Sequence, residues 1–283
     1  MNNAIVKAPV ILMRELNSVF IEMTQKNCNL RCSHCYLDFP QKSVKDFISI
    51  ERVKSILHQI KNSDVKYIHL TGGEPMLHPD FNAILRMCLK VTSVVIHTNG
   101  TMINDKKARF LRKVEDEKNN DFEIIFRISI DHFQEDINDS IRGRGAYRKS
   151  LNALKSLFKY DFNPILTIVN HFELPEDEIK EEFSHICSDF GFETEDLNFK
   201  IIPLFKKGVI KSTDNFDEKI IKTDCSKSRT VSSKGVFTCP FMANDNRGQC
   251  GSELSDYSLK SYVESDFCTQ CVEHNKSNFC FDW

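Results

Sequence analysis

Three cysteines near the start of the chain stand close enough together to bind one metal centre. The segment Cys28-Asn29-Leu30-Arg31-Cys32-Ser33-His34-Cys35 has the spacing C-x3-C-x2-C. Three thiolates on one loop can hold a 4Fe–4S cluster and leave one iron without a protein ligand. An open metal position can bind a substrate or cofactor, as open sites do in catalytic metal centres. A zinc site, with His34 as a fourth ligand, is the alternative that the spacing leaves open.

A second group of cysteines lies in the last fifth of the chain. Its members are Cys225, Cys239, Cys250, Cys268, Cys271 and Cys280. Two pairs of thiols, including the C-x2-C pair of Cys268 and Cys271, can enclose one metal ion or cluster completely. The sequence therefore predicts a second metal centre, for which a zinc ribbon is the structural alternative.

Composition limits the kind of protein that carries these cysteines. The chain has 283 residues, 11 of them cysteine, with 41% hydrophobic and 28% charged residues, as in soluble globular proteins. A net charge of -2 gives no basic field for nucleic acid. No apolar run approaches the ~20 residues of a membrane helix, or suffices for a signal peptide. We therefore expect a cytoplasmic protein without a membrane or nucleic-acid partner, whose thiols stay reduced and bind metal.

The first two-thirds of the chain alternates strand and helix patterns that would position the first cysteines. Strands are predicted at 18–24, 67–70, 93–97, 122–130, 164–169 and 199–202, and helices at 50–60, 81–89, 106–114, 147–158 and 176–190. Such an order implies parallel strands with right-handed crossovers. Six units, where a TIM barrel has eight, predict an α/β fold with a partial (β/α)6 TIM-like barrel.

The pattern ends near Lys206, where the composition becomes polar. We expect the barrel to occupy residues 14–208. The remaining segment, 209–283, has little apolar content, so we expect a small cysteine-rich domain that metal stabilises. Within the barrel, Cys88 and Cys187 lie on apolar faces of predicted helices and should be buried as small hydrophobic residues.

Further motifs follow the predicted strands in a fixed order. They are Gly72-Gly73-Glu74-Pro75 after the second strand, Thr98-Asn99-Gly100 after the third, Ser129-Ile130-Asp131 at the end of the fourth, and Arg142-Gly143-Arg144-Gly145, expected to open the next helix region. Together with the cysteine loop, they make the segment from Ser18 to Pro203 resemble the radical S-adenosylmethionine (radical SAM) superfamily. The resemblance implies the partial barrel and an iron–sulfur enzyme.

The resemblance also implies the chemistry of the first cysteine loop. Cys28, Cys32 and Cys35 would hold a 4Fe–4S cluster whose open iron is chelated by the amino and carboxylate groups of S-adenosylmethionine. Reductive cleavage of the sulfonium bond would release methionine and a 5′-deoxyadenosyl radical, which takes a hydrogen atom from the substrate. A reductase such as flavodoxin or ferredoxin would supply the electron.

The expected cofactor-binding residues share a place near the carboxyl ends of the strands. They are Tyr36, Gly72, Gly73, Glu74, Asn99, Ser129 and Arg142. The two glycines would let the backbone approach the cofactor, and Glu74 would accept hydrogen bonds from its ammonium group. Arg142 would pair with its carboxylate. Asn99 and Ser129 would reach the ribose or carboxylate, and His34 or Tyr36 would contact the adenine.

The C-terminal cysteines resemble the SPASM and Twitch extensions of this superfamily, which carry auxiliary iron–sulfur clusters. The two-cluster SPASM pattern needs more cysteines after the C-x2-C pair than occur here. The resemblance therefore implies one auxiliary 4Fe–4S cluster. Its expected ligands are Cys225, Cys239, Cys268 and Cys271, with Cys280 as a replacement for one of them and Cys250 unassigned.

Three functions are compatible with these features. The first is a radical SAM enzyme that modifies a peptide, since auxiliary clusters are frequent in peptide-maturing members of the superfamily. The second is a radical SAM dehydrogenase or epimerase of a small metabolite such as a sugar, nucleoside or aminoglycoside. The third is a non-catalytic protein that binds zinc or iron–sulfur through both cysteine groups. Metal content and formation of 5′-deoxyadenosine distinguish the third from the first two.

Overall fold

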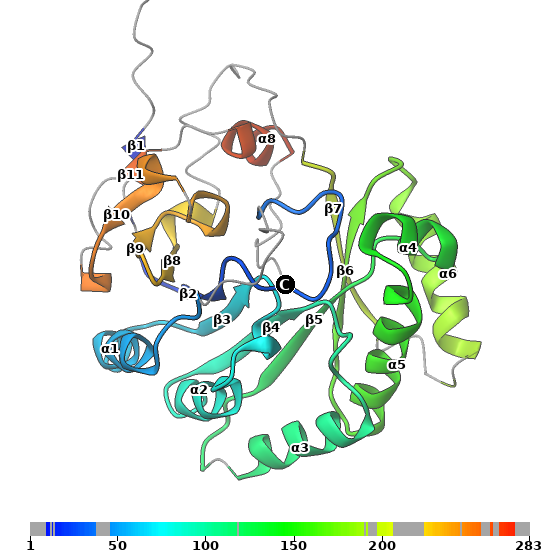
Figure 1. Ribbon diagram of the computed structural model, residues 1–283, viewed down its shortest axis with the longest axis horizontal. Helices are drawn as coiled ribbons and strands as arrows, with labels where there is room; N and C mark the ends of the chain where they lie inside the picture. The colour runs from blue at the N-terminus through cyan, green and yellow to red at the C-terminus, as the bar shows by residue number, and fades with distance from the viewer. Residues whose placement is uncertain are drawn as a thin grey trace, which may run out of the picture.

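Six parallel strands form the centre of the protein (Figure 1). They are β2 (Ser18–Thr24), β3 (Tyr67–Gly72), β4 (Ser93–Thr98), β5 (Ile124–Ser129), β6 (Ile165–Asn170) and β7 (Asn198–Pro203), paired in that order. The computed structural model describes residues 10–11, 13, 15–37, 46–117, 119–189, 191, 197–205, 224–243, 245–255, 261–262 and 266–274. The parallel order confirms the predicted α/β fold with a partial TIM-like barrel.

Helices follow the strands and cover the outer side of the curved sheet (Figure 1). They are α1 (Ile50–Ile60), α2 (Phe81–Cys88), α3 (Asp105–Asp116), α4 (Glu135–Arg142), α5 (Ala146–Lys159) and α6 (Glu176–Asp189). The side chain of Ser49 caps α1 by accepting a hydrogen bond from the backbone N–H of Arg52, which satisfies an otherwise unpaired donor. The apolar residues of α1 recur at helical spacing and are buried against the sheet. No helix among the described residues is long and apolar enough to cross a membrane.

The motif from Arg142 to Gly145 directly precedes the predicted helix at 147–158, but its arginine belongs to an earlier helix that the sequence did not predict. Arg142 is the last residue of α4, and α5 begins at Ala146. Between the two helices, Gly143 and Gly145 have φ angles of 115° and 77°. Such positive angles end a helix at little cost only for glycine. The four-residue motif therefore separates two helices, and its arginine lies at the end of the first.

The C-terminal region continues the same sheet beyond β2. Strand β8 (Ser228–Ser232) pairs with β2 in parallel, and β9 (Gly235–Phe237) and β10 (Gln249–Gly251) follow as antiparallel neighbours. Helix α8 (Asp266–His274) comes later in the chain, and β1 (Val10–Ile11) pairs with β11 (Ser261–Tyr262). The predicted boundary at 208 lies outside the described residues, so the domain division stays a prediction.

Two histidines face each other inside the sheet. The Nδ1 atom of His69 in β3 lies 2.9 Å from Nε2 of His97 in β4, and the His69 ring stacks on Phe20 at 4.1 Å between centroids. Burial, followed by the charge of Arg127, holds the pKa of each imidazole well below 6.5. Both rings are therefore neutral in the folded protein at neutral pH.

Acid should destabilise the fold through this histidine pair. The unfolded chain takes up protons as the pH falls below 6.5, but the folded pair does not, so the free energy of unfolding decreases below that pH. We expect His69→Gln to weaken this loss between pH 7 and pH 5, measured by urea unfolding at each pH. The control is His58→Gln, which removes an exposed histidine outside this pair. If the free energy of unfolding fell equally for His69→Gln and the parent between pH 7 and pH 5, the role of the buried neutral pair would be contradicted.

Candidate functional site

A pocket lies where the parallel strands end, with an empty volume of about 880 Å³ that includes space open to solvent. Most of the cofactor-binding residues expected from the sequence line it. They are Cys28, Cys32, Cys35, Tyr36, Gly72, Gly73, Asn99, Ser129 and Arg142. Loops after parallel strands form the ligand-binding edge of such sheets. The three cysteines and the motifs that follow β3, β4, β5 and α4 therefore meet at one site.

The loop that carries the three cysteines is fixed by backbone contacts on both sides. The N–H of Cys35 donates to the carbonyl of Cys32 at 3.2 Å, and the N–H of Ser33 donates to the carbonyl of Ile141 in α4 at 2.9 Å. Burial raises the pKa of the Cys28 thiol to about 11, and it also raises the pKa of Cys32. All three cysteines are half-buried. Partly buried thiolates need a cationic partner, and three of them beside an open pocket fit an iron–sulfur cluster with one open iron.

Gly72 occupies a position that only glycine can fill. Its φ is +114°, and a Cβ atom there would lie 2.2 Å from the carbonyl oxygen of Thr24 in β2. The next N–H, of Gly73, donates to that same oxygen at 2.8 Å. The sequence predicted close approach of the backbone to a ligand. The structure shows that Gly72 is also required for the close approach of β3 to β2.

Glu74 is fully buried and is not among the residues that line the pocket. Its carboxylate accepts hydrogen bonds from the Thr98 hydroxyl at 2.8 Å, the Asn99 N–H at 3.0 Å and the Met76 N–H at 3.1 Å. These donors hold the Glu74 carboxylate between the ends of β3 and β4, and its contact with an ammonium group stays a prediction.

Asn99 connects the end of β4 to the cysteine loop. Its Nδ2 donates to Oδ1 of Asn29 at 2.9 Å, and its Oδ1 accepts from the N–H of Thr101 at 2.9 Å. The Ser150 hydroxyl of α5 donates to its backbone carbonyl at 2.8 Å. Asn99 is thus held rigidly at the pocket wall beside the cysteines, in the place expected for a cofactor-binding residue.

A buried ion pair joins Arg142 to Asp131. The Nη1 atom of Arg142 lies 2.8 Å from Oδ2 of Asp131, while Oδ1 accepts from the N–H of Val169 at 3.2 Å. Burial alone would raise the pKa of Asp131, but the charge of Arg142 and its hydrogen bond hold that pKa below its ordinary value. The Nε atom of Arg142 is buried and has no hydrogen-bond partner among the described residues. The guanidinium therefore has a donor left for an anionic group in the pocket.

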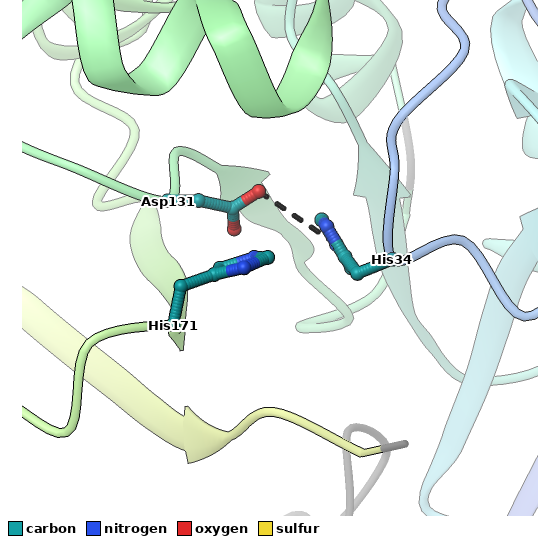
Figure 2. A group of neighbouring side chains, drawn as sticks. All are labelled: His34, Asp131 and His171. Carbon is teal, nitrogen blue, oxygen red and sulfur yellow. Dashed lines mark ion pairs between the residues drawn. The ribbon is translucent and has the colours of Figure 1, made fainter. Parts of the chain in front are cut away.

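His171 joins this pair from the loop after β6, and the sequence analysis missed it. In Figure 2 the His34 and His171 rings point toward Asp131, with side-chain ligand atoms all within 4.8 Å of one another. Nε2 of His34 is 3.6 Å from Oδ2 of Asp131. Burial lowers the pKa of His34 to about 4, so its ring is neutral near pH 7. The only available signal was the place of His171, directly after a strand end.

The group in Figure 2 resembles a metal site in its residue types, but its charge argues against a cation. The Asp131 oxygen that faces His34 also accepts a hydrogen bond from the guanidinium of Arg142. A metal ion there would be repelled by that neighbouring positive charge. The neutral rings instead present hydrogen-bonding atoms, because Nδ1 of His34 and Nε2 of His171 are buried without a partner among the described residues.

Tyr36 lines the same pocket, but its ring is held by the protein. The phenol is buried beside Glu22 and Thr71, and burial raises its pKa well above the ordinary value. Its ring meets Phe241 edge to face at 5.1 Å between centroids. Burial also raises the pKa of Glu22 to about 8. Tyr36 therefore links the cysteine loop to the C-terminal region, through Phe241.

The structure brings three of the C-terminal cysteines together. Burial raises the pKa of Cys239 well above its ordinary value, and the neighbouring Cys225 and Cys268 raise it further. Cys268 and Cys271 are three residues apart in α8, so they lie on one face of that helix. The stacked rings of Phe241 and Phe267, 4.6 Å between centroids, hold α8 against the segment after Cys239.

Of the two remaining C-terminal cysteines, Cys250 and Cys280, the structure describes only the first. Cys250 is buried in β10, where its sulfur lies 3.8 Å from the Thr238 hydroxyl. Cys280 lies outside the described residues. The arrangement of Cys225, Cys239 and Cys268 is compatible with one enclosed metal centre, and the ligand set stays a prediction.

Comparisons with known proteins agree with the fold. The sequence profile of the Radical SAM superfamily matches residues 23–186. The antilisterial bacteriocin subtilosin biosynthesis protein AlbA of Bacillus subtilis is 33% identical over 138 residues, which cover 48% of this chain and 29% of AlbA. The mycofactocin maturase MftC of Mycobacterium tuberculosis is 27% identical over 190 residues, covering 65% of this chain and 43% of MftC.

Among solved structures, anSMEcpe with bound AdoMet superposes with a TM-score of 0.63 at 17% identity. The match covers 85% of this chain and 79% of that one. At this identity the likeness concerns the fold alone. The matched segment of each curated relative is less than half of its length.

Proposed function

Because the chain belongs to the Radical SAM superfamily, we propose that it is an enzyme that cleaves S-adenosylmethionine reductively and removes a hydrogen atom from a substrate. Cys28, Cys32 and Cys35 would hold the 4Fe–4S cluster at the pocket. When bound, the cluster and S-adenosylmethionine supply the radical chemistry, and the protein supplies binding and orientation. The observation that carries the proposal is the meeting of the three thiols with the strand-end motifs in one pocket.

Different residues of the pocket would bind different groups of the cofactor. The backbone of Gly72 and Gly73 is exposed to the pocket and offers carbonyl oxygens to an ammonium group. The free Nε donor of Arg142 suits a carboxylate. Asn99 and Ser129, both at the pocket wall, suit a ribose or carboxylate. Glu74 acts through Asn99 by holding its N–H.

An auxiliary 4Fe–4S cluster belongs to the same proposal. Cys225, Cys239, Cys268 and Cys271 would hold it. The closeness of Cys239 to Cys225 and Cys268, and the shared helix face of Cys268 and Cys271, support this ligand set. Four thiolates would enclose the cluster completely, as in electron-transfer centres.

A peptide is the substrate class that we propose. AlbA is named for bacteriocin biosynthesis and MftC as a maturase, and another anSMEcpe structure contains AdoMet together with a peptide. A reductase such as flavodoxin or ferredoxin would deliver the electron. A cytoplasmic location would keep the many thiols reduced.

The proposal is tested with anaerobically reconstituted protein and peptides encoded by short open reading frames that flank its gene. We expect about eight irons per chain for two 4Fe–4S clusters, and 5′-deoxyadenosine after reduction with dithionite in the presence of S-adenosylmethionine. Peptides deuterated at carbon should transfer deuterium to that product and change mass. Transfer from sugars or nucleosides, and none from peptides, would favour the small-metabolite alternative. Stoichiometric zinc and no 5′-deoxyadenosine would contradict the enzyme.

A further inference from the structure

Arg229 is a buried arginine beside the C-terminal cysteines. It lies in β8, opposite Val19 of β2, and its relative exposure is 0%. A guanidinium remains charged at every pH that a protein tolerates. Burying such a charge is strongly unfavourable unless an anion or a full set of acceptors compensates it. A compensating group must therefore be found for Arg229.

Backbone acceptors satisfy one side of this guanidinium only. Nη1 donates to the carbonyl of Cys225 at 2.9 Å and to that of Ser228 at 2.8 Å. Nε and Nη2 are buried and have no hydrogen-bond partner among the described residues. The guanidinium is thus held by the backbone of a cysteine from the proposed auxiliary site, with two of its nitrogens left over.

Sulfur atoms are the titratable groups beside the guanidinium of Arg229. They belong to Cys250, Cys225 and Cys239. Neutral thiols are weak acceptors and cannot balance a buried positive charge. A 4Fe–4S cluster with four thiolates carries net negative charge, so it would balance that charge where the free thiols do not.

We propose that Arg229 is the counter-charge of the auxiliary iron–sulfur cluster and raises its reduction potential. The inference rests on the proposed function, because it presupposes that Cys225, Cys239, Cys268 and Cys271 hold this cluster. One-electron reduction adds one negative charge to the cluster, and a fixed positive charge nearby stabilises the reduced state more than the oxidised one. Net charge and hydrogen bonds to sulfur are among the factors that set such potentials.

The experiment compares the reconstituted parent with Arg229→Gln, Arg229→Met and Arg229→Lys. Each protein is titrated with dithionite, and the reduction of each cluster is followed by electron paramagnetic resonance. At the parent's auxiliary midpoint, we expect the ratio of reduced to oxidised auxiliary cluster to fall at least tenfold in the two neutral variants, which is 59 mV for one electron. Arg229→Lys keeps the charge and should stay within tenfold of the parent. Arg86→Met, at an exposed arginine paired with Glu117, should change nothing.

The outcomes separate the inference from the proposed function. A parent with about four irons and one paramagnetic centre would show that the auxiliary cluster itself is absent. Two loaded clusters with the same midpoint in parent and neutral variants would overturn the role of Arg229 alone. An equal shift in Arg229→Lys and Arg229→Met would also overturn it, because the effect would then follow shape and not charge. Arg229→Met provides the neutral comparison if the buried amide of Arg229→Gln prevents folding.

Discussion

Cys32→Ala is expected to reduce formation of 5′-deoxyadenosine by at least about a thousandfold, because catalytic groups that act as a unit fail together when one is removed. Cys32 lies between the other two cysteines of the loop and lines the same pocket. Without its thiolate, two protein ligands remain for a cluster that requires three. The reduced protein is incubated with S-adenosylmethionine under anaerobic conditions, the nucleoside product is quantified by chromatography, and iron is measured in the same sample.

The matched control removes a cysteine elsewhere in the barrel. Cys187 is buried on α6 and does not line the pocket. Cys187→Ala removes a small buried side chain, so it should lower stability modestly and leave product formation and iron content near those of the parent. Product at the parent's level from Cys32→Ala would remove the cysteine loop from the catalytic site.

Local patterns were sufficient for most of the barrel. The predicted strand at 18–24 and helix at 50–60 coincide with β2 and α1. In each case one side of the element is apolar, and the periodicity of that side decides between strand and helix. Helix α4 has the sequence EDINDSIR, in which Ile137 and Ile141 are the only apolar residues, and two positions are too few to establish a period. That helix was not predicted for this reason, and neither was the place of Arg142 at its end.

Strand β8 could not be predicted from its own residues. Its sequence SRTVS has one apolar residue, yet all five residues are buried. The strand forms because β2, about two hundred positions earlier, offers an unpaired edge with which it pairs in parallel. Pairing between distant segments leaves no local periodicity, so the attachment of the C-terminal region to the barrel sheet became visible only in the structure.

In the candidate site, too, some residues could be predicted from the sequence and others could not. The spacing of the three cysteines predicts a metal centre, and the glycine pair was predicted from the motif that carries the family resemblance; all five residues line the pocket. Glu74 was placed in the pocket because its carboxylate suits an ammonium group, but hydrogen-bond donors from two strand ends enclose it. His171 has no motif, and its role depends on a contact with Asp131 from the neighbouring strand.

We expect Gly72→Ala to lower the free energy of unfolding more than the control variant Gly191→Ala does. The added Cβ would lie 2.2 Å from the Thr24 carbonyl oxygen, at a φ of +114° that other residues rarely adopt. Backbone strain of this kind costs roughly 1–3 kcal/mol, and the clash adds to it. The Thr24 carbonyl also accepts the N–H of Gly73, so relief of the clash would displace a backbone segment of the pocket.

Gly191→Ala separates this clash from the effect of the backbone angle. Gly191 has a φ of +81°, but no atom of the residues that the structure describes lies within 4 Å of a Cβ added there. This control should therefore show only the angular strain, with a smaller loss in the free energy of unfolding measured in urea. Because Gly191 follows α6 and does not line the pocket, Gly191→Ala should keep 5′-deoxyadenosine formation, whereas Gly72→Ala should lose most of it. Equal losses in the free energy of unfolding would show that the Thr24 carbonyl of β2 can move away from the added Cβ. Glycine at position 72 would then be required only for the approach of the ligand.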